Sequence, residues 1–404
     1  MQLTDVRTIV DDPHGTYAAL REAGPVHRVP GTDGKPAWLV TRYEDVRAAL
    51  ADPRLSLDKR HAAPGNYTGM SLPPALDANL LNMDPPDHTR IRRLVVKAFT
   101  PGRVEKLRVP VRRAADALLD AAAADASGTF DLIAAYAGPL PIAVMCDLLG
   151  VPRDDRPDFR SWTDALVAPD PARPEAAKEA VGHLMRFVTR LLAAKRAAPA
   201  DDLLSDLIAV RDDEGGGRLS EDELLSLAFL LLFAGYENVT HLIGNTVLAL
   251  LDHPGLLTTL RKDPDGLPAL VEEVNRWDGP APLAIRRFPL EDVEIGGVTV
   301  PAGETVLLSL ASANRDPARF PDPDRLDLRR GASGQLSLGH GIHYCLGAAL
   351  GRMEAETAVE ALLSRFDELE LAVPRGSLTW RPTVRARGLI SLPLRGISSR
   401  RTGF

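Results

Sequence analysis

The sequence predicts a mainly α (α+β) protein, with a large helical part and a smaller β-rich part. Its middle carries apolar residues at helical spacing, whereas Pro and Gly concentrate in the first hundred residues and over 279–341. Strand-like segments gather between residues 283 and 310 instead of alternating with helices. The 404 residues, 45% of them hydrophobic, can bury a large core. We expect a single domain over 1–404, because no repeat or low-complexity linker divides the chain.

The expected elements begin with a strand over 38–41 and a short helix through Val46 and Leu50, followed by a loop over 64–74 that Gly and Pro punctuate. Long helices are expected over 104–124, 176–196 and 220–251. The last of these begins with Ser220 and Glu223, which form a capping box. Its apolar residues nearly encircle it, as in a helix buried in a large domain. Packing in an apolar core does not explain the polar residues Glu237 and Asn238 near its middle, so these two residues require another explanation.

The strands of the β-rich part follow. Segments 293–295 and 298–300 flank a Gly-Gly pair, which is a hairpin signal, and 305–308 is a third strand. A helix over 347–366 then follows Cys345 directly.

Charge and composition exclude several classes of protein. The net charge of −7 and a pI near 5.8 argue against a nucleic-acid partner, which requires a basic patch. The N-terminus lacks the pattern of a signal peptide, and no run approaches the ~20 apolar residues of a membrane span. We expect a soluble, cytoplasmic protein that acts as a monomer, without a membrane or nucleic-acid partner.

Two cysteines, Cys146 and Cys345, are too few for a disulfide framework, so each needs its own explanation. Cys146 ends the apolar run 140–146 and is expected to be a buried, inert thiol. Cys345 lies among Gly339, Gly341 and Gly347 immediately before a helix, where backbone donors favour a thiolate. A lone thiolate of this kind suits an iron already held by a macrocycle. The alternative is a Gly-rich turn around an inert cysteine, which the full Gly-x-Gly-x-His-x-Cys-x-Gly pattern disfavours.

The segment 338–352 resembles the haem-binding loop of the cytochrome P-450 monooxygenases, and the resemblance extends from about Pro25 to Leu394. It implies that family's helical prism with a smaller β-rich part, and haem b between the I and L helices. Cys345 would be the axial ligand of the haem iron, in a loop that includes Gly339 and Gly347. Leu338 stands where the family usually has Phe, so the shielding of the thiolate, and with it the iron potential, is expected to differ.

The resemblance also implies partners for the two haem propionates, which need cations when buried. These positions are His88, Arg92, Arg287 and His343.

A second implied group is structural. Glu273 and Arg276 match the Glu-x-x-Arg of the family's K helix, where three-residue spacing places both on one helix face. Arg325 is the position that matches the family's further arginine.

The distal oxygen-activation segment is similar to Ala234-Gly235-Tyr236-Glu237-Asn238. Glycine in a buried helix costs about 1 kcal/mol, so Gly235 is expected to open the helix for dioxygen and water. Asn238 stands where the family usually has Thr and lacks a hydroxyl, but its amide can bind water or oxygen. Thr240 does not obviously replace it, since two residues on it points about 200° around the helix.

The resemblance implies a haem-thiolate monooxygenase that receives electrons from NAD(P)H through a separate ferredoxin and ferredoxin reductase. Basic contacts for these partners are expected among Arg93, Lys97, Arg103 and Arg352. The nearest branch tailors polyketides, macrolides and peptides in antibiotic biosynthesis, and the expected substrate is a bulky hydrophobic small molecule. Two alternatives stay open: an oxidative C–C or C–O coupling enzyme on the same scaffold, and an inactive, haem-free partner protein.

Overall fold

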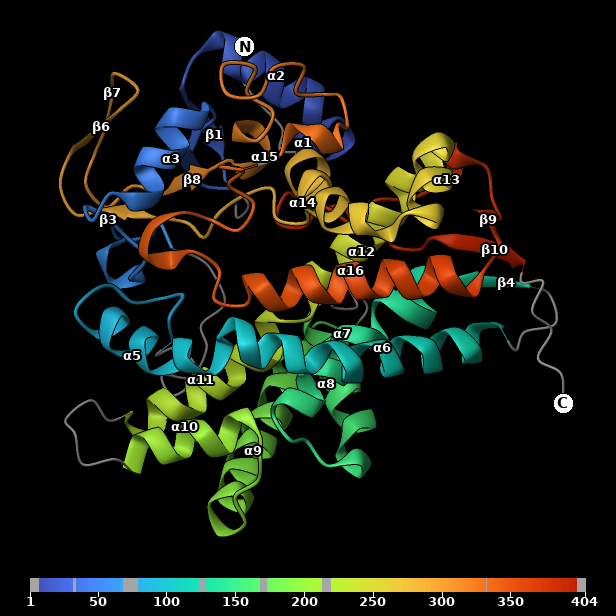
Figure 1. The fold of residues 1–404 in the computed structure, drawn as a ribbon. Coiled ribbons are helices and arrows are strands. Elements are labelled where there is room, and N and C mark those ends of the chain that lie inside the picture. The colour runs from blue at the N-terminus through green and yellow to red at the C-terminus, as the bar shows by residue number, and fades with distance from the viewer. Residues whose placement is uncertain are drawn as a thin grey trace, which may run out of the picture.

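The computed structural model describes residues 7–31, 34–67, 79–123, 128–167, 173–212, 219–331 and 333–397. Helices predominate and the strands form small sheets, which confirms the mainly α (α+β) prediction. The long helices α6 and α16 run side by side across the molecule (Figure 1). The N-terminal elements, in blue, lie beside the orange segment that contains β8 and α15.

The helices account for most of the described residues. They are α1 (Arg7–Asp11), α2 (Pro13–Ala23), α3 (Tyr43–Ala51), α5 (Asp87–Val95), α6 (Pro101–Ala123), α7 (Pro139–Leu148), α8 (Arg156–Val167), α9 (Pro174–Ala197), α10 (Leu203–Asp212), α11 (Glu221–Ala234), α12 (Glu237–Asp252), α13 (Pro254–Lys262), α14 (Leu267–Asp278), α15 (Leu310–Ala313) and α16 (Ala348–Arg365). The predicted helices over 104–124, 176–196 and 347–366 are confirmed within three residues at each end.

The helix predicted over 220–251 is instead two helices, α11 and α12, separated at Gly235 and Tyr236. The predicted capping box is confirmed. The Glu223 N–H donates to Ser220 Oγ at 3.1 Å, and the Ser220 N–H donates to Glu223 Oε2 at 2.7 Å. Of the loop expected over 64–74, residues 68–74 lie outside the described residues.

Among the described residues the strands form four small sheets. They are β1 (Val26–Pro30), β2 (Pro36–Val40), β3 (Leu55–Ser56), β4 (Thr129–Asp131), β5 (Phe288–Pro289), β6 (Val293–Ile295), β7 (Val298–Val300), β8 (Val306–Leu308), β9 (Glu368–Leu371) and β10 (Pro393–Ile397). Their orders are β1-β2-β8, β4-β10-β9, β3-β5 and β6-β7. The predicted β6–β7 hairpin is confirmed, and Gly296 and Gly297 turn it with φ values of 56° and 80°, which glycine tolerates best.

The largest hydrophobic cluster joins the helices from α5 to α14 with α16. Tyr136 links the segment before α7 to α16, since its hydroxyl donates to the carbonyl of Ala358 at 2.8 Å. Cys146 lies in this cluster, and burial raises the pKa of its thiol to about 12. The prediction that Cys146 is buried is therefore confirmed.

The stretch Glu221–Asp252 is long and apolar enough to cross a membrane by composition. Within its most apolar window, 71% is buried inside the protein, as in a core helix.

Candidate active site

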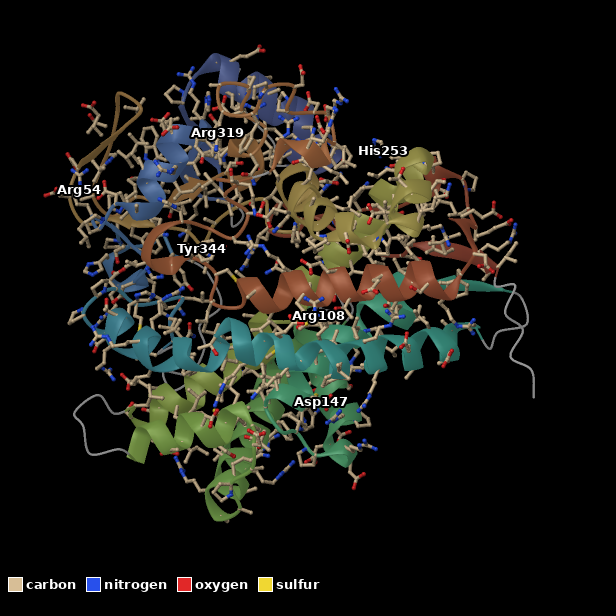
Figure 2. The ribbon with its side chains drawn as sticks, viewed as in Figure 1. Arg54, Arg108, Asp147, His253, Arg319 and Tyr344 are labelled. Carbon is tan, nitrogen blue, oxygen red and sulfur yellow. The ribbon has the colours of Figure 1, made fainter. Side chains whose placement is uncertain are left out.

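Cys345 lies in a loop directly before α16, next to Tyr344 (Figure 2). The N–H of Cys345 donates to the carbonyl of Leu338 at 2.8 Å and closes the loop. Gly339 and Gly341 have φ values of 77° and 73°, and a Cβ at Gly341 would lie 3.2 Å from Ala51 Cα. The two glycines thus allow the loop to pass close to α3 and present the exposed Cys345.

The electrostatic setting of Cys345 combines opposing effects. Desolvation by the surrounding protein raises the pKa of its thiol, whereas the N–H of Gly347 and the cations Arg92 and Arg352 lower it. A Cβ at Gly347 would meet no atom of the described residues within 4 Å. The start of α16 therefore supplies a donor to the sulfur and leaves room beside it.

Four basic side chains converge near this loop. His88 and Arg92 come from α5, Arg287 from the segment before β5, and His343 from the loop itself. The rings of His88 and His343 lie 4.1 Å apart between centroids, and Arg92 donates to the carbonyl of Tyr344. The structure thus brings together the four positions that the sequence singled out.

Burial and mutual repulsion destabilise the protonated forms of these groups and lower their pKa values. Desolvation and the neighbouring Arg92 lower the pKa of His88 to about 4, and desolvation, His88 and the two arginines lower that of His343 to about 3. Desolvation also lowers the pKa of Arg287 to about 10, against the attraction of Asp84. A cluster of this kind is stabilised by a bound anion.

Several donors in the cluster have no acceptor. Within the described part of the chain, both ring nitrogens of His88 and Nε of Arg287 are buried without a hydrogen-bond partner. The acid nearby, Asp84, already accepts from Ser56 Oγ and from the N–H of Leu57. Buried polar atoms are normally paired, so these donors fit a ligand that carries anionic oxygens.

A break between α11 and α12 marks the distal segment. Gly235 ends α11, and a Cβ there would lie 2.7 Å from Sδ of Met145 on α7. The sequence suggested that Gly235 opens the helix. The structure adds that this glycine also makes room for Met145.

The residues after the break differ in exposure. Ala234 and Asn238 are exposed, and Glu237 is half-buried. Thr240 is buried, and its hydroxyl donates to the carbonyl of Tyr236 at 3.1 Å within the helix. The side chain of Thr240 thus serves its own helix and does not replace a hydroxyl at position 238.

The helix α12, which bears Glu237 and Asn238, packs against α16, the helix that follows Cys345. A Cβ at Gly351 on α16 would lie 3.4 Å from Cγ2 of Val239 on α12. The distal segment and the helix that follows Cys345 therefore belong to one packed unit.

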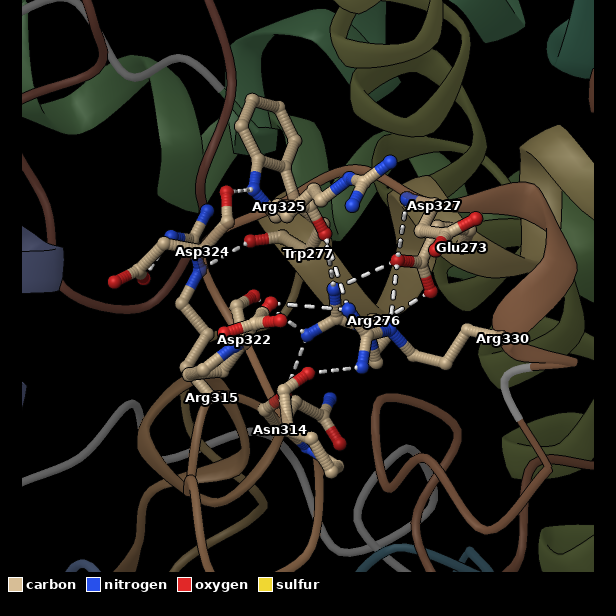
Figure 3. A network of polar contacts seen from close by, with 12 residues as sticks. Glu273, Arg276, Trp277, Asn314, Arg315, Asp322, Asp324, Arg325, Asp327 and Arg330 are labelled. Carbon is tan, nitrogen blue, oxygen red and sulfur yellow. Dashed lines mark hydrogen bonds and ion pairs between the residues drawn. The ribbon is translucent and has the colours of Figure 1, made fainter.

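Glu273 and Arg276 on α14 form a fully buried ion pair (Figure 3). Arg276 Nε and a terminal nitrogen donate to the two Glu273 oxygens at 2.8 and 2.7 Å. Arg276 also donates to the carbonyls of Asn314 and Pro323 at 2.9 and 3.0 Å. The pair therefore fixes α14 to the segments around 314 and 323.

Two arginines join this pair, the predicted Arg325 through its backbone and Arg330 through its side chain. Arg325 contributes only its backbone carbonyl, which accepts from Arg276 at 3.3 Å. The side chain that reaches Glu273 is Arg330, with Nε 3.2 Å from Oε1. The turn over 321–327 places its carbonyls on Arg276, and the short 3-10 helix Leu328–Arg330 brings Arg330 back toward Glu273.

Comparison with known proteins agrees with this geometry. A family model described as Cytochrome P450 matches residues 157–375. The chain belongs to the cytochrome P450 family. This P450 is 47% identical over 392 residues to the cytochrome P450 monooxygenase PikC of Streptomyces venezuelae, covering 97% of this chain and 93% of PikC. It is 43% identical to the mycinamicin IV hydroxylase/epoxidase of Micromonospora griseorubida, with 94% of each protein covered.

The solved structure of the ligand-free P450 monooxygenase TamI superposes with a TM-score of 0.88 at 44% identity, over 98% of this P450 and 94% of TamI. The predicted fold and reaction class are therefore confirmed. The protein is a P450 monooxygenase with the P450 fold, and its family uses haem and separate redox partners. The thiol of Cys345, the room beside Gly347 and the unpaired donors of His88 and Arg287 fit the haem that the family implies.

The sequence reasoning missed three polar residues near the site. Arg330 completes the Glu273 pair, and His241 and Asn245 are buried on α12. The signal for the last two was available, because they follow Glu237 at intervals of four residues.

Proposed function

We propose that this P450 uses haem b to insert one oxygen atom from O2 into a bulky hydrophobic natural product, such as a polyketide or macrolide. The observation that carries the proposal is Cys345 beside a cluster of four basic groups, two of which, His88 and Arg287, have buried nitrogens without a hydrogen-bond partner in the described part of the chain. The names of two relatives that span nearly the whole chain, a monooxygenase and a hydroxylase/epoxidase, favour oxygen insertion.

The chain's own residues would hold the haem. Cys345 would ligate the iron through sulfur, and His88, Arg92, Arg287 and His343 would bind the propionates. When bound, the haem supplies oxygen activation, with the thiolate as electron donor. The attraction of anionic propionates would offset the desolvation that disfavours the protonated forms of these four groups.

Glu237 and Asn238 would act on the distal side. Glu237 is half-buried and can hold a proton, whereas the exposed amide of Asn238 can bind water, oxygen or a substrate group but cannot exchange a hydroxyl proton. Ala234 and Gly235 add little side-chain bulk beside this pair, and Met145 packs against Gly235.

The substrate class follows from exposed apolar side chains. Leu81, Ile285 and Ile390 are 36%, 40% and 51% exposed, and they come from three segments far apart in the sequence. Exposed apolar groups of this size are typical of surfaces that contact a hydrophobic ligand.

The redox partners would be a ferredoxin and an NAD(P)H-dependent ferredoxin reductase. The P450 itself would be a cytoplasmic monomer. Of the basic side chains expected to meet them, Arg93 is exposed, Arg103 is paired with Asp206, and Arg352 donates to Glu272 at 2.7 and 3.0 Å. Arg93 is thus the readiest contact, and the side chain of Lys97 lies outside the described part.

Spectroscopy tests the haem proposal. The reduced, carbon monoxide-bound protein should show the red-shifted Soret band of thiolate ligation, and Cys345→Ala should abolish it. Cys146→Ala is the matched control and should retain the band, because its thiol is buried in the core. A thiolate band that survives in Cys345→Ala would contradict the assignment, and a wild-type protein without a Soret band would favour the haem-free alternative.

Product mass separates oxygen insertion from oxidative coupling, which Asn238 keeps open because coupling uses protons differently. A panel of macrolides and aromatic natural products would be screened for spectral shifts and then turned over with ferredoxin and reductase. Oxygen insertion adds one oxygen atom to the product, whereas coupling removes two hydrogen atoms.

A further inference from the structure

Three polar residues lie along one face of α12. Glu237, His241 and Asn245 are four residues apart, so they project from successive turns of the same helix face. Eight residues of helix span about 12 Å. The row runs from the distal segment toward the end of α14.

His241 is the middle member, and it is buried with its ring unbonded. Its side chain is 1% exposed, and neither ring nitrogen has a hydrogen-bond partner among the residues that the structure describes. Its Nε2 lies 3.6 Å from Oε1 of Glu237. The other side of the ring packs on Gly388, where a Cβ would lie 2.0 Å from Nδ1. Gly388 thus makes room for an imidazole that ordinary core packing does not require.

Asn245 continues the row. Its Nδ2 donates to the carbonyls of Asp278 and Arg387 at 2.8 and 3.0 Å, whereas its Oδ1 is buried without a partner in the described part of the chain. Unpaired buried polar atoms in a row are the usual partners of ordered water.

The far end of the row reaches a pocket. Asp278 and Arg387 line it together with His14 from α2. His14 Nε2 lies 3.3 Å from Asp278 Oδ1, and the His14 side chain is 31% exposed. A path of polar groups therefore leads from a partly exposed histidine to the half-buried Glu237.

We propose that Glu237, His241 and Asn245 form a proton path along α12, filled by ordered water, that delivers protons from the His14–Asp278 pocket to Glu237. His241 accepts a proton from water at one ring nitrogen as its Nε2–H proton passes to the Glu237 carboxylate. At the first ring nitrogen an N–H bond forms as an O–H bond of the water breaks, and at Nε2 an N–H bond breaks as the O–H bond of Glu237 forms. The water that donated regains a proton from solvent along the path, so one proton from solvent arrives at Glu237. The ring then regains its starting tautomer by proton exchange with water.

The path provides the proton transfer that the side chain at position 238 cannot carry out. Asn238 has no hydroxyl to exchange, and the hydroxyl of Thr240 is bonded to its own helix. This inference rests on the proposed oxygen-inserting function, because that reaction consumes protons at the distal segment.

The first test compares two ways of driving the holoenzyme, using the compound that the product assay above identifies. NAD(P)H-driven turnover needs delivered protons, whereas hydrogen peroxide brings oxygen and protons in one reagent. His241→Leu should lower NAD(P)H-driven product at least about 10-fold, the low end of proton-transfer effects, raise peroxide release, and retain peroxide-driven turnover. His241→Gln, which hydrogen-bonds but does not carry a proton, should behave like His241→Leu.

Thr240→Val is the matched control, since it removes a buried polar group from the neighbouring position and should leave both reactions unchanged. A His241→Leu protein that couples NAD(P)H to product like the parent would overturn the proposal. So would restored coupling in His241→Gln, because a hydrogen bond alone would then suffice.

The second test needs no turnover. In the reduced, carbon monoxide-bound holoenzyme with 15N-labelled histidine, Glu237→Gln should shift the ring-nitrogen resonances of His241, which His241→Gln identifies by their loss. Unchanged His241 resonances would show that the two side chains do not exchange or share a proton, and the proposal would fail. A protein without the thiolate Soret band would instead refute the proposed function.

Discussion

Asn238 is the residue at which this P450 departs most from the pattern of its family. Its side chain is exposed next to Glu237, so it can contact water, oxygen or substrate. The sequence identified this departure, because a missing hydroxyl is visible in the residue type alone. For His241 the sequence offers only its four-residue spacing from Glu237, since its burial and contact with Gly388 depend on the loop that follows Trp380.

Substitution of Asn238 distinguishes its two possible roles. If Asn238 positions water or oxygen, Asn238→Ala should slow turnover and raise peroxide release, and Asn238→Thr should keep or improve coupling. If it binds a substrate group, both variants should weaken the substrate-induced spectral shift, by ~1–3 kcal/mol for an unpaired partner. Binding constants and peroxide yield, measured together, separate these roles. Variants that bind and couple like the parent would make Asn238 a packing residue.

The buried Glu273–Arg276 pair gives a structural prediction. Glu273→Ala leaves Arg276 buried and unpaired, which should cost roughly 3–5 kcal/mol. We therefore expect little soluble haem protein. A well-folded, haem-replete Glu273→Ala protein with slower turnover would contradict a purely structural role.

Arg325 and Arg330 are a matched pair of variants for the same network. Arg330→Ala removes a side chain that bonds Glu273 and the carbonyls of Pro321 and Asp322, and should cost about 1–3 kcal/mol. Arg325→Ala should cost no more than about 0.5 kcal/mol, because only the Arg325 carbonyl takes part. Urea unfolding midpoints measure both, and equal losses would argue against this assignment of the third arginine. The sequence could not separate the two arginines, because the path of the turn over 321–327 decides which side chain returns to Glu273.

At the scale of elements, α12 depends on close contact with the segment that contains Gly388. Gly388→Ala would drive a Cβ into the His241 ring, and overpacking of this kind costs about 1–3 kcal/mol. Gly376→Ala is the matched control, since a Cβ there meets no atom within 4 Å. Thermal unfolding of the double variant Gly388→Ala/His241→Ala should recover most of the loss. If it does not, the clash lies elsewhere.

The break between α11 and α12 shows where element prediction stops. Apolar periodicity predicted the full extent of the helical stretch, and Gly235 marked a weak point in it. Periodicity within one segment carries no information about Met145, which lies on another helix and needs the space at Gly235.

At the scale of the molecule, local pattern predicted the helices and the β6–β7 hairpin, because each depends on residues close in sequence. Local sequence pattern could not predict which strands pair when they lie in distant segments. β2 pairs with β8 in parallel, and β10 pairs with β4. The four basic positions were predicted through resemblance alone, since α5, the segment before β5 and the cysteine loop meet only in the folded chain.

Asp278 joins three distant parts of the molecule, and its protonation tests that connection. Burial alone would raise the pKa of Asp278, but hydrogen bonds and charge from His14 and Arg387 outweigh it and lower the pKa from 3.8 to about 2. Because the folded-state pKa is depressed, the resulting stability is present above the unfolded value of 3.8 and is lost as pH falls toward 2. Just under two pKa units correspond to about 2 kcal/mol.

We therefore expect Asp278→Asn to lower the free energy of unfolding by about 2 kcal/mol at pH 7, and by clearly less at pH 3. Urea unfolding of the haem-bound protein at both pH values measures the difference, with Asp154→Asn as an exposed control that should change little at either. A penalty that stays constant between the two pH values would mean that Asp278 stabilises the junction through packing, without a contribution from its charge. A penalty that shrinks with acid would show that α2, α14 and the segment around Arg387 are held together by this carboxylate.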